Sequence, residues 1–195
     1  DQQGDRSAFL TNLKILAENG FMGVNINEQY GRTNADTVSF SLALTELGRA
    51  CASTAVTTSV TNMVAEVIQA VGNEAQRARY LPKICSGDYA AGGFCLTESG
   101  SGSNPSAMRC SAEKTNDGWE INGAKQYITS AEFAGVFVVW AVTDKNASKG
   151  KGISCFLGEA NNPGLGVSKA EKNMHQHGAT TNAPVCDKCI ESAAV

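Results

Sequence analysis

One short segment concentrates the side chains that could bind a phosphorylated or heterocyclic ligand. Residues 94–104 read Phe-Cys-Leu-Thr-Glu-Ser-Gly-Ser-Gly-Ser-Asn. Thr97 and Ser103 carry hydroxyls on either side of a turn that contains Gly100 and Gly102. Glycine allows positive φ and a close approach of backbone to ligand, so N–H groups there can meet phosphate oxygens or the edge of a ring. The competing interpretation is a Gly-Ser turn that only reverses the chain.

Three further segments accompany this one in a fixed order. The chain reads Tyr-Leu-Pro-Lys-Ile-Cys-Ser-Gly at 80–87, Glu-Ile-Asn-Gly-Ala-Lys-Gln-Tyr-Ile-Thr at 120–129 and Glu-Lys-Asn-Met at 171–174. Together with residues 94–104 they resemble the acyl-CoA dehydrogenase family, whose flavin-binding signature typically reads aromatic-Cys-aliphatic-Thr-Glu-Pro-Gly-small-Gly-Ser-Asp. Several motifs in order are more specific than one glycine-rich loop. The likeness extends over residues 13–189.

A few positions depart from the family pattern. Ser99 stands where the family usually has proline, and Asn104 where it usually has aspartate. Asparagine keeps one acceptor and adds a donor, but it lacks the negative charge. The related acyl-CoA oxidases often carry asparagine there, so reaction with oxygen stays open. His175, His177 and Ala179 also differ from the family's usual residues.

The resemblance implies an enzyme that oxidises the α,β bond of an acyl-CoA thioester. A carboxylate removes a proton from the α carbon, and the β hydrogen leaves as hydride to N5 of FAD. An electron-transfer flavoprotein or a similar acceptor then takes the electrons. In the family the base lies in a C-terminal helical domain that we expect to be missing here, so no residue of this chain is predicted to be catalytic. We therefore expect the chain alone to be inactive and the full-length protein to be a homo-oligomer.

The same resemblance implies which residues contact the flavin. Thr97 and Thr129 correspond to threonines whose hydroxyl or backbone N–H bonds the N5 and O4 edge of the ring. Tyr127 replaces the usual tryptophan that covers one flavin face. Ser103 corresponds to a serine near the FAD pyrophosphate and the CoA chain, so it is also the predicted substrate-binding residue. Glu98 is interpreted as structural, because the matching family glutamate is not the base. The predicted cofactor-binding residues are Phe94, Leu96, Thr97, Gly102, Ser103, Tyr127, Ile128 and Thr129.

Each of these residues also has a purely structural interpretation, because threonine favours strands and aromatic or aliphatic side chains fill cores. Two other functions stay open beside the dehydrogenase. One is an acyl-CoA oxidase-like flavoprotein, which hydrogen peroxide production would reveal. The other is a non-catalytic module that binds acyl-CoA or a partner without flavin, against which retained flavin absorbance would argue.

The first half of the chain has the apolar periodicity of helices. Gly20 is a suitable C-terminal stop for the first helix, and Asn34 or Asp36 can cap the second. Residues 52–71 are rich in β-branched side chains, which favours a helix buried between neighbours. The last helix ends before Pro82. The predicted helices cover residues 9–17, 40–47, 52–71 and 73–81.

Short runs of β-forming residues follow. The predicted strands cover residues 92–97, 109–113, 119–121, 125–129, 136–142 and 153–157. Asn116-Asp117-Gly118 and Asn122-Gly123 predict hairpins, and residues 144–152 a solvated loop. Helices followed by strands indicate an α+β protein with two adjoining units. We predict an N-terminal helical bundle over residues 1–88 and a small antiparallel β-barrel, the flavin-binding domain, over residues 89–195.

Composition narrows the classes of protein and partner. A hydrophobic content of 42% is typical of a globular chain, and the formal net charge of -3 gives no reason to expect a nucleic-acid partner. No apolar run reaches the roughly 18 residues that would cross a membrane. The N-terminal residues lack the pattern of a secretory signal.

The seven cysteines favour a reducing compartment, because their number is odd and the chain is long. We expect the bacterial cytoplasm or the mitochondrial matrix. Cys186 and Cys189 form the only Cys-x-x-Cys pair and could hold zinc with His175 and His177. The preferred interpretation is structural cysteines and no metal.

Overall fold

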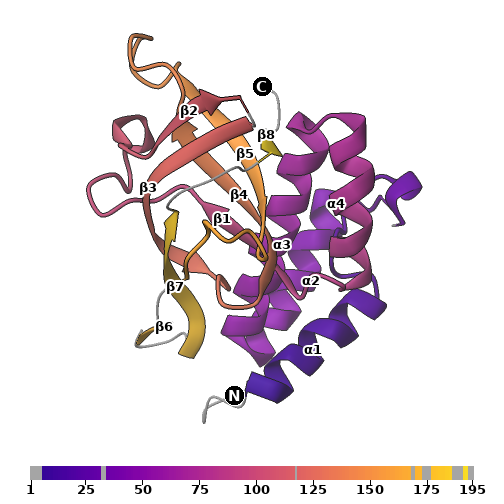
Figure 1. Ribbon diagram of the computed structural model, residues 1–195. Coiled ribbons are helices and arrows are strands. Elements are labelled where there is room, and N and C mark those ends of the chain that lie inside the picture. Colours follow the sequence, from indigo (N-terminus) through magenta and orange to yellow (C-terminus); the bar gives the residue numbers. More distant parts are fainter. Residues whose placement is uncertain are drawn as a thin grey trace.

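The helices gather on one side of the molecule and the strands curl into a half-barrel on the other (Figure 1). The computed structural model describes residues 6–31, 34–116, 118–167, 170–172, 177–185 and 191–192. Helices comprise α1 (Arg6–Glu18), α2 (Thr37–Ala50), α3 (Ala52–Val71) and α4 (Glu74–Ser86), with short 3-10 turns η1 (Glu28–Tyr30) and η2 (Pro105–Ala107). The strands are β1 (Ala91–Cys95), β2 (Ser111–Thr115), β3 (Gly118–Thr129), β4 (Ala134–Val142), β5 (Ile153–Glu159), β6 (Ala170–Lys172), β7 (His177–Val185) and β8 (Glu191–Ser192).

The predicted helix 52–71 and the predicted stop at Gly20 and cap at Asp36 are confirmed, while α1 begins and α2 begins and ends about a turn beyond the predicted ranges. Gly20, just past α1, has a φ of 86°, the left-handed conformation that glycine adopts readily. Asp36 caps α2 by accepting a hydrogen bond from the backbone N–H of Ser39 at 2.7 Å. The predicted end before Pro82 is wrong, because α4 continues to Ser86. Proline removes one intrahelical bond, but Ile84 and Cys85 continue the buried face of the helix and hold its last turn in place.

The predicted α+β class is confirmed. The strands form one sheet in the order β6-β7-β3-β2-β4-β5-β8, with β1 added beside β4. Most neighbouring strands are antiparallel, but β1 runs parallel to β4, and β2 meets β4 in one parallel pairing, Ser111 with Val142. The sheet is therefore mixed, and not antiparallel throughout as the sequence predicted.

The two hairpin predictions have opposite outcomes. Thr115 pairs with Gly118, which confirms the turn between β2 and β3, although Asp117 lies outside the described residues. Asn122-Gly123 forms no turn and lies inside β3, which is one strand instead of the two predicted. Gly123 has a φ of 151°, and a Cβ there would lie 2.8 Å from the Cβ of Cys110. Its glycine serves close packing within a bent strand.

The long helix α3 lies against β1 and joins the helices to the sheet. Its threonines are buried as predicted, among them Thr54, Thr57 and Thr61. Around them is a core cluster that includes Val64, Ile68, Leu81, Ile84, Val136, Val138 and Leu157. By contrast α2 has no buried residue, and Leu42 on its predicted apolar stripe is 64% exposed.

A polar cluster closes the seam between helices and sheet. Tyr89, between α4 and β1, donates a short hydrogen bond to the carboxylate of Glu159 at the end of β5. Arg79 of α4 lies 2.7 Å from the same carboxylate, and Lys83 lies 3.4 Å from it. The Tyr89 bond, with the arginine beside it, holds the pKa of Glu159 below its ordinary value, while burial and this bond raise the pKa of Tyr89.

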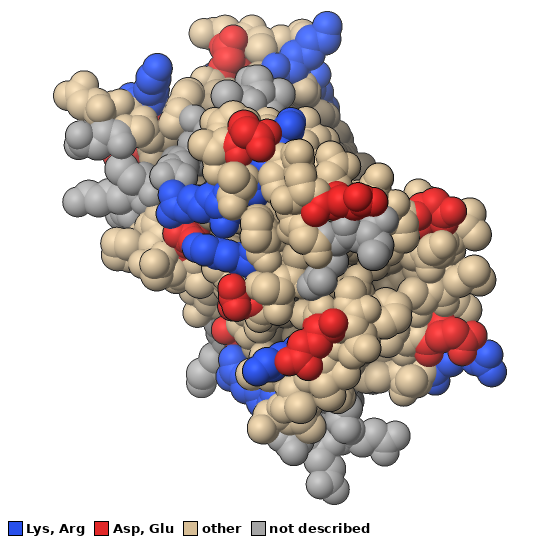
Figure 2. All heavy atoms as spheres, turned by 90° about the vertical axis from the view of Figure 1, so that its right-hand side faces the viewer, with Lys and Arg blue, Asp and Glu red and all other residues tan. Residues whose placement is uncertain are grey.

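Two observations concern partners. Among the described residues on the face that carries the helices, acidic and basic side chains lie interspersed (Figure 2). Within the part of the chain that the structure describes, no helix combines the length and apolar character that a membrane span requires.

Candidate functional site

Residues 96–104 form a loop that is tied to the C-terminal part of β3. The backbone N–H of Gln126 donates to the carbonyl of Thr97 at 2.8 Å. Within the loop, Glu98 and Ser101 exchange backbone hydrogen bonds of 3.0 and 3.1 Å, which closes a tight turn. The two segments predicted to contact a flavin, around Thr97 and around Tyr127, therefore lie side by side.

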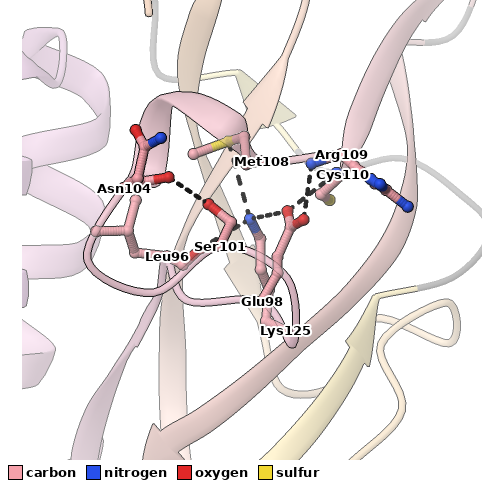
Figure 3. Close-up of polar contacts among 8 residues, drawn as sticks. All are labelled: Leu96, Glu98, Ser101, Asn104, Met108, Arg109, Cys110 and Lys125. Carbon is pink, nitrogen blue, oxygen red and sulfur yellow. Dashed lines mark hydrogen bonds and ion pairs between the residues drawn. The ribbon is translucent and has the colours of Figure 1, made fainter.

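A buried ion pair lies beneath this loop (Figure 3). The Nζ of Lys125 is 2.9 Å from Oε1 of Glu98, and the lysine side chain has no exposed surface. The same Nζ donates to the carbonyl of Leu96 at 3.1 Å and lies 4.0 Å from Sδ of Met108. The lysine thus has a polar partner on each side, as a buried ammonium group requires.

Both carboxylate oxygens of Glu98 are also engaged. Oε2 accepts from the backbone N–H of Arg109 at 2.7 Å, and Oε1 accepts from that of Cys110 at 2.9 Å. Burial alone would raise the pKa of Glu98, but these N–H groups and Lys125 outweigh burial and hold the pKa below its ordinary value. A carboxylate so fully bonded is a poor base, which supports the structural role expected of Glu98.

Tyr127 is placed on the surface by a bulge in β3. Its φ is 58°, and the pairing with β7 shifts register between Lys125 and Ile128. In a regular strand two residues three apart face opposite sides, yet Lys125 and Ile128 are both buried, because the bulge adds a residue between them. The same irregularity leaves the Tyr127 ring 57% exposed, where a planar ligand could stack on it.

The predicted site residues fall into two groups. Thr97 and Thr129 are half-buried, while Gly102 and Ser103 are exposed, so all four have surface that a ligand could reach. Ile128 is 1% exposed and packs in the sheet core, so only its backbone could contribute. Leu96 and Phe94 are both half-buried. The ring of Phe94 packs against Trp140, with ring centroids 6.2 Å apart.

The expectation that Gly100 and Gly102 adopt positive φ is wrong. Neither Gly100 nor Gly102 has a positive φ, and a Cβ at either position would meet no atom within 4 Å. The conformation of the described chain therefore does not require glycine there. What remains of the prediction is the close approach of a ligand to exposed backbone.

Asn104 closes the far side of the loop. Its backbone carbonyl accepts from the hydroxyl of Ser101 at 2.7 Å, and its Oδ1 accepts from the hydroxyl of Ser106 at 2.6 Å. Sequence reasoning did not foresee these contacts, nor the ion pair of Lys125 with Glu98. Lys125 belonged to a recognised motif, but a lysine within a strand pattern gives no sign that it is buried.

The described residues contain no group of three or more histidine, cysteine or acidic side chains placed to hold a metal ion. Cys186, Cys189 and His175 lie outside the described residues, so the zinc alternative is untested.

Comparison with known proteins now adds to this geometry. The profile of the acyl-CoA dehydrogenase N-terminal domain matches residues 2–88, and that of the acyl-CoA dehydrogenase middle domain matches residues 93–189. The chain belongs to the acyl-CoA dehydrogenase family.

Individual members of the acyl-CoA dehydrogenase family agree with this assignment. The chain is 37% identical over 176 residues to an acyl-CoA dehydrogenase of Bacillus subtilis, covering 90% of this chain and 46% of that one. Its fold matches butyryl-CoA dehydrogenase from Megasphaera elsdenii with a TM-score of 0.84 and 32% identity, over 99% of this chain and 51% of the other. It also matches glutaryl-CoA dehydrogenase from Mycobacterium smegmatis in complex with FADH2, with a TM-score of 0.84 and 29% identity over 95% and 46% of the two chains. The chain thus spans about half the length of these relatives.

Proposed function

We propose that the protein to which this chain belongs is an FAD-dependent acyl-CoA dehydrogenase that oxidises the α,β bond of an acyl-CoA thioester. The observation that carries the proposal is the 96–104 loop, whose Gly-Ser turn is exposed and sterically open and whose Thr97 is bound to Gln126, the residue before the exposed Tyr127. Thr97 and Thr129 are half-buried. This donor set fits a flavin, which needs hydrogen-bond donors at its ring edge, a stacking surface and N–H groups for its pyrophosphate. When bound, FAD would supply the hydride acceptor at N5.

The residues of this chain would bind and orient the flavin and the CoA chain, and would not remove the α proton of the thioester. Thr97 and Thr129 would donate to the ring edge, and Tyr127 would cover one face. Gly102 and Ser103 would meet phosphate oxygens, with Ser103 also touching the CoA chain. We propose no residue of this chain as the base, because Glu98 is committed to Lys125 and to two backbone N–H groups. The chain alone is therefore expected not to turn over substrate.

We also propose a division into a helical domain over residues 1–88 and a flavin-binding domain over residues 89–195. The end of α4 at Ser86 and the start of β1 at Ala91 support this division. For the whole protein we propose a homo-oligomer that passes electrons to an electron-transfer flavoprotein or a similar acceptor, in the bacterial cytoplasm or the mitochondrial matrix. The acyl-CoA oxidase alternative rests on one residue, Asn104.

The test uses the whole protein, purified and mixed with FAD and a series of acyl-CoA thioesters. We expect flavin absorbance that follows the protein, reduction of a dye acceptor without oxygen, and little hydrogen peroxide in air. Peroxide formed at the rate of substrate oxidation would favour the oxidase, and a protein that binds acyl-CoA but no flavin would favour the non-catalytic module.

Thr97→Val tests the assignment of the site. It removes the hydroxyl while keeping the side chain's shape, and loss of one hydrogen bond of about 1 kcal/mol should lower kcat/KM by about fivefold. Thr115→Val, on an exposed position of β2, is the matched control and should leave kcat/KM unchanged. Equal kinetics for the two variants would remove Thr97 from the site.

A further inference from the structure

The Lys125–Glu98 pair is almost completely buried. Lys125 and Glu98 have side chains that are 0% and 9% exposed. A buried ion pair gains little over apolar residues of the same volume, because taking two charges out of water offsets their attraction. What charged partners add is directionality, since each bond fixes the placement of a particular backbone group.

The pair fixes three backbone segments at once. Lys125 Nζ binds the carbonyl of Leu96, the residue directly before Thr97. Glu98 binds the N–H groups of Arg109 and Cys110, at the start of β2. The backbone of Glu98 closes, with Ser101, the turn that contains Gly100.

Lys125 also directly precedes residues 126–129 of β3, which form the side of the site opposite the loop. Gln126, which follows it, donates its N–H to the carbonyl of Thr97, and the bulge at Tyr127 comes next. Figure 3 shows the Lys125 side chain reaching from β3 to Glu98 and Leu96 of the loop, one residue away from the Gln126–Thr97 contact in the sequence of each segment. A shift of the lysine would move the Thr97 side and the Tyr127 side of the site relative to each other.

We propose that Glu98 and Lys125 are positioning residues that hold the 96–104 loop and the 126–129 end of β3 in the relative placement that binds the flavin. This inference rests on the proposed function. Neither side chain would touch the cofactor, because the polar atoms of both are already bonded to groups beneath the loop. The alternative is that the pair stabilises the fold and has no particular effect on the flavin.

The experiment compares Lys125→Met, Glu98→Gln and the double variant with the unchanged protein, always as the whole protein. Three quantities are measured: Tm of the flavin-free protein, the dissociation constant for FAD, and the visible absorption spectrum of the bound flavin. Arg79→Met is the control, because it breaks a different, less buried ion pair, 2.7 Å from Glu159, at the seam between helices and sheet. Lys145→Met removes the same charge as Lys125→Met from an exposed pair.

Lys125→Met and Glu98→Gln are expected to lower Tm and to weaken FAD binding by about tenfold or more, within the usual range of coupling between sites. The double variant removes both charges, so its Tm should recover toward that of the unchanged protein. Its FAD affinity should stay low and its flavin spectrum shifted, since the directional bonds are still missing. Arg79→Met should lower Tm and Lys145→Met should not, with FAD affinity preserved in both.

Unchanged FAD affinity and spectrum in folded Lys125→Met or in the double variant would overturn the positioning role. An equal loss of affinity in Arg79→Met would overturn it as well, because destabilisation alone would then explain the effect. If the unchanged protein binds no FAD, it is the proposed function that fails. Should the single variants not fold, amide exchange of the unchanged protein decides: saturating FAD must slow exchange at Arg109 and Cys110, and unchanged exchange there refutes the coupling.

Discussion

Replacing Gly102 by alanine separates a glycine that the fold needs from one that a ligand needs. Gly102 is exposed, its φ is not positive, and an added Cβ would meet nothing within 4 Å. Alanine also restricts the unfolded chain, which stabilises a protein by about 0.4–1 kcal/mol where the native conformation allows it. The free energy of unfolding of Gly102→Ala should therefore stay the same or rise by up to about 1 kcal/mol.

Ligand binding should change in the opposite direction. If the backbone at Gly102 approaches phosphate oxygens within hydrogen-bond distance, a methyl group on that surface must push the phosphate away. Losing one charge-assisted hydrogen bond costs about 1.5–3 kcal/mol, which corresponds to a dissociation constant at least about tenfold higher. Flavin fluorescence quenching measures this for FAD, and calorimetry measures it for CoA.

Gly123→Ala is the contrasting control. The φ of Gly123 is 151°, and a Cβ added there would lie only 2.8 Å from the Cβ of Cys110, so alanine should lower the free energy of unfolding by about 1–3 kcal/mol. Urea unfolding of both variants gives the comparison. If Gly102→Ala binds FAD and CoA as the unchanged protein does, then the turn is not a ligand cradle and the open space above it has no function. A loss of stability as large as that of Gly123→Ala would show instead that the fold itself requires the glycine.

Two further predictions concern stability. Because the Tyr89 bond and Arg79 lower the pKa of Glu159, the stabilisation from this carboxylate is present above its unfolded pKa of about 4.5 and is lost as pH falls through the lower folded value. Glu159→Gln should thus lower the free energy of unfolding at pH 7 by about 1 kcal/mol and flatten its decline in acid, and an acid slope unchanged from the parent protein would contradict this. The adjacent threonines of α3 form a matched pair: Thr57 bonds the hydroxyl of Ser130 at 2.9 Å, whereas the buried Oγ1 of Thr58 has no partner among the described residues. Thr57→Val should destabilise by about 1 kcal/mol and Thr58→Val should be neutral or stabilising, and calorimetric Tm values in the reverse order would refute the reasoning.

The order of helices and strands could be predicted because local signals decide it. The apolar spacing, the Asp36 cap and Gly20 mark helix ends through contacts within a few residues. The errors arose where distant parts of the chain take over. Pro82 is kept inside α4 by the buried face that continues beyond it, and Gly123 is required by Cys110, which lies directly before β2. Neither contact leaves a trace in the local sequence.

The residue types of the candidate site could be predicted from the sequence, but the buried contacts that hold these residues in place could not. Exposed hydroxyls and glycines on one short loop can be recognised from the sequence, because the chemistry they offer does not depend on their neighbours. The role of Lys125 depends on burial and on partners from a loop far away in the chain, so it follows only from the folded structure. The bulge at Tyr127 is similar, since its purpose is clear only when Lys125 and Ile128 are both seen to be buried.

The asparagine at position 104, where the family usually has aspartate, does not change the hydrogen bonds that hold the loop. Its side-chain oxygen accepts a hydrogen bond from Ser106, and its backbone carbonyl accepts one from Ser101. An aspartate could accept both bonds equally well, so the loop conformation does not distinguish the two residues. They differ in charge and in the amide donor, and Asn104 is exposed. Any consequence of asparagine at this position must therefore fall on what approaches the loop from outside.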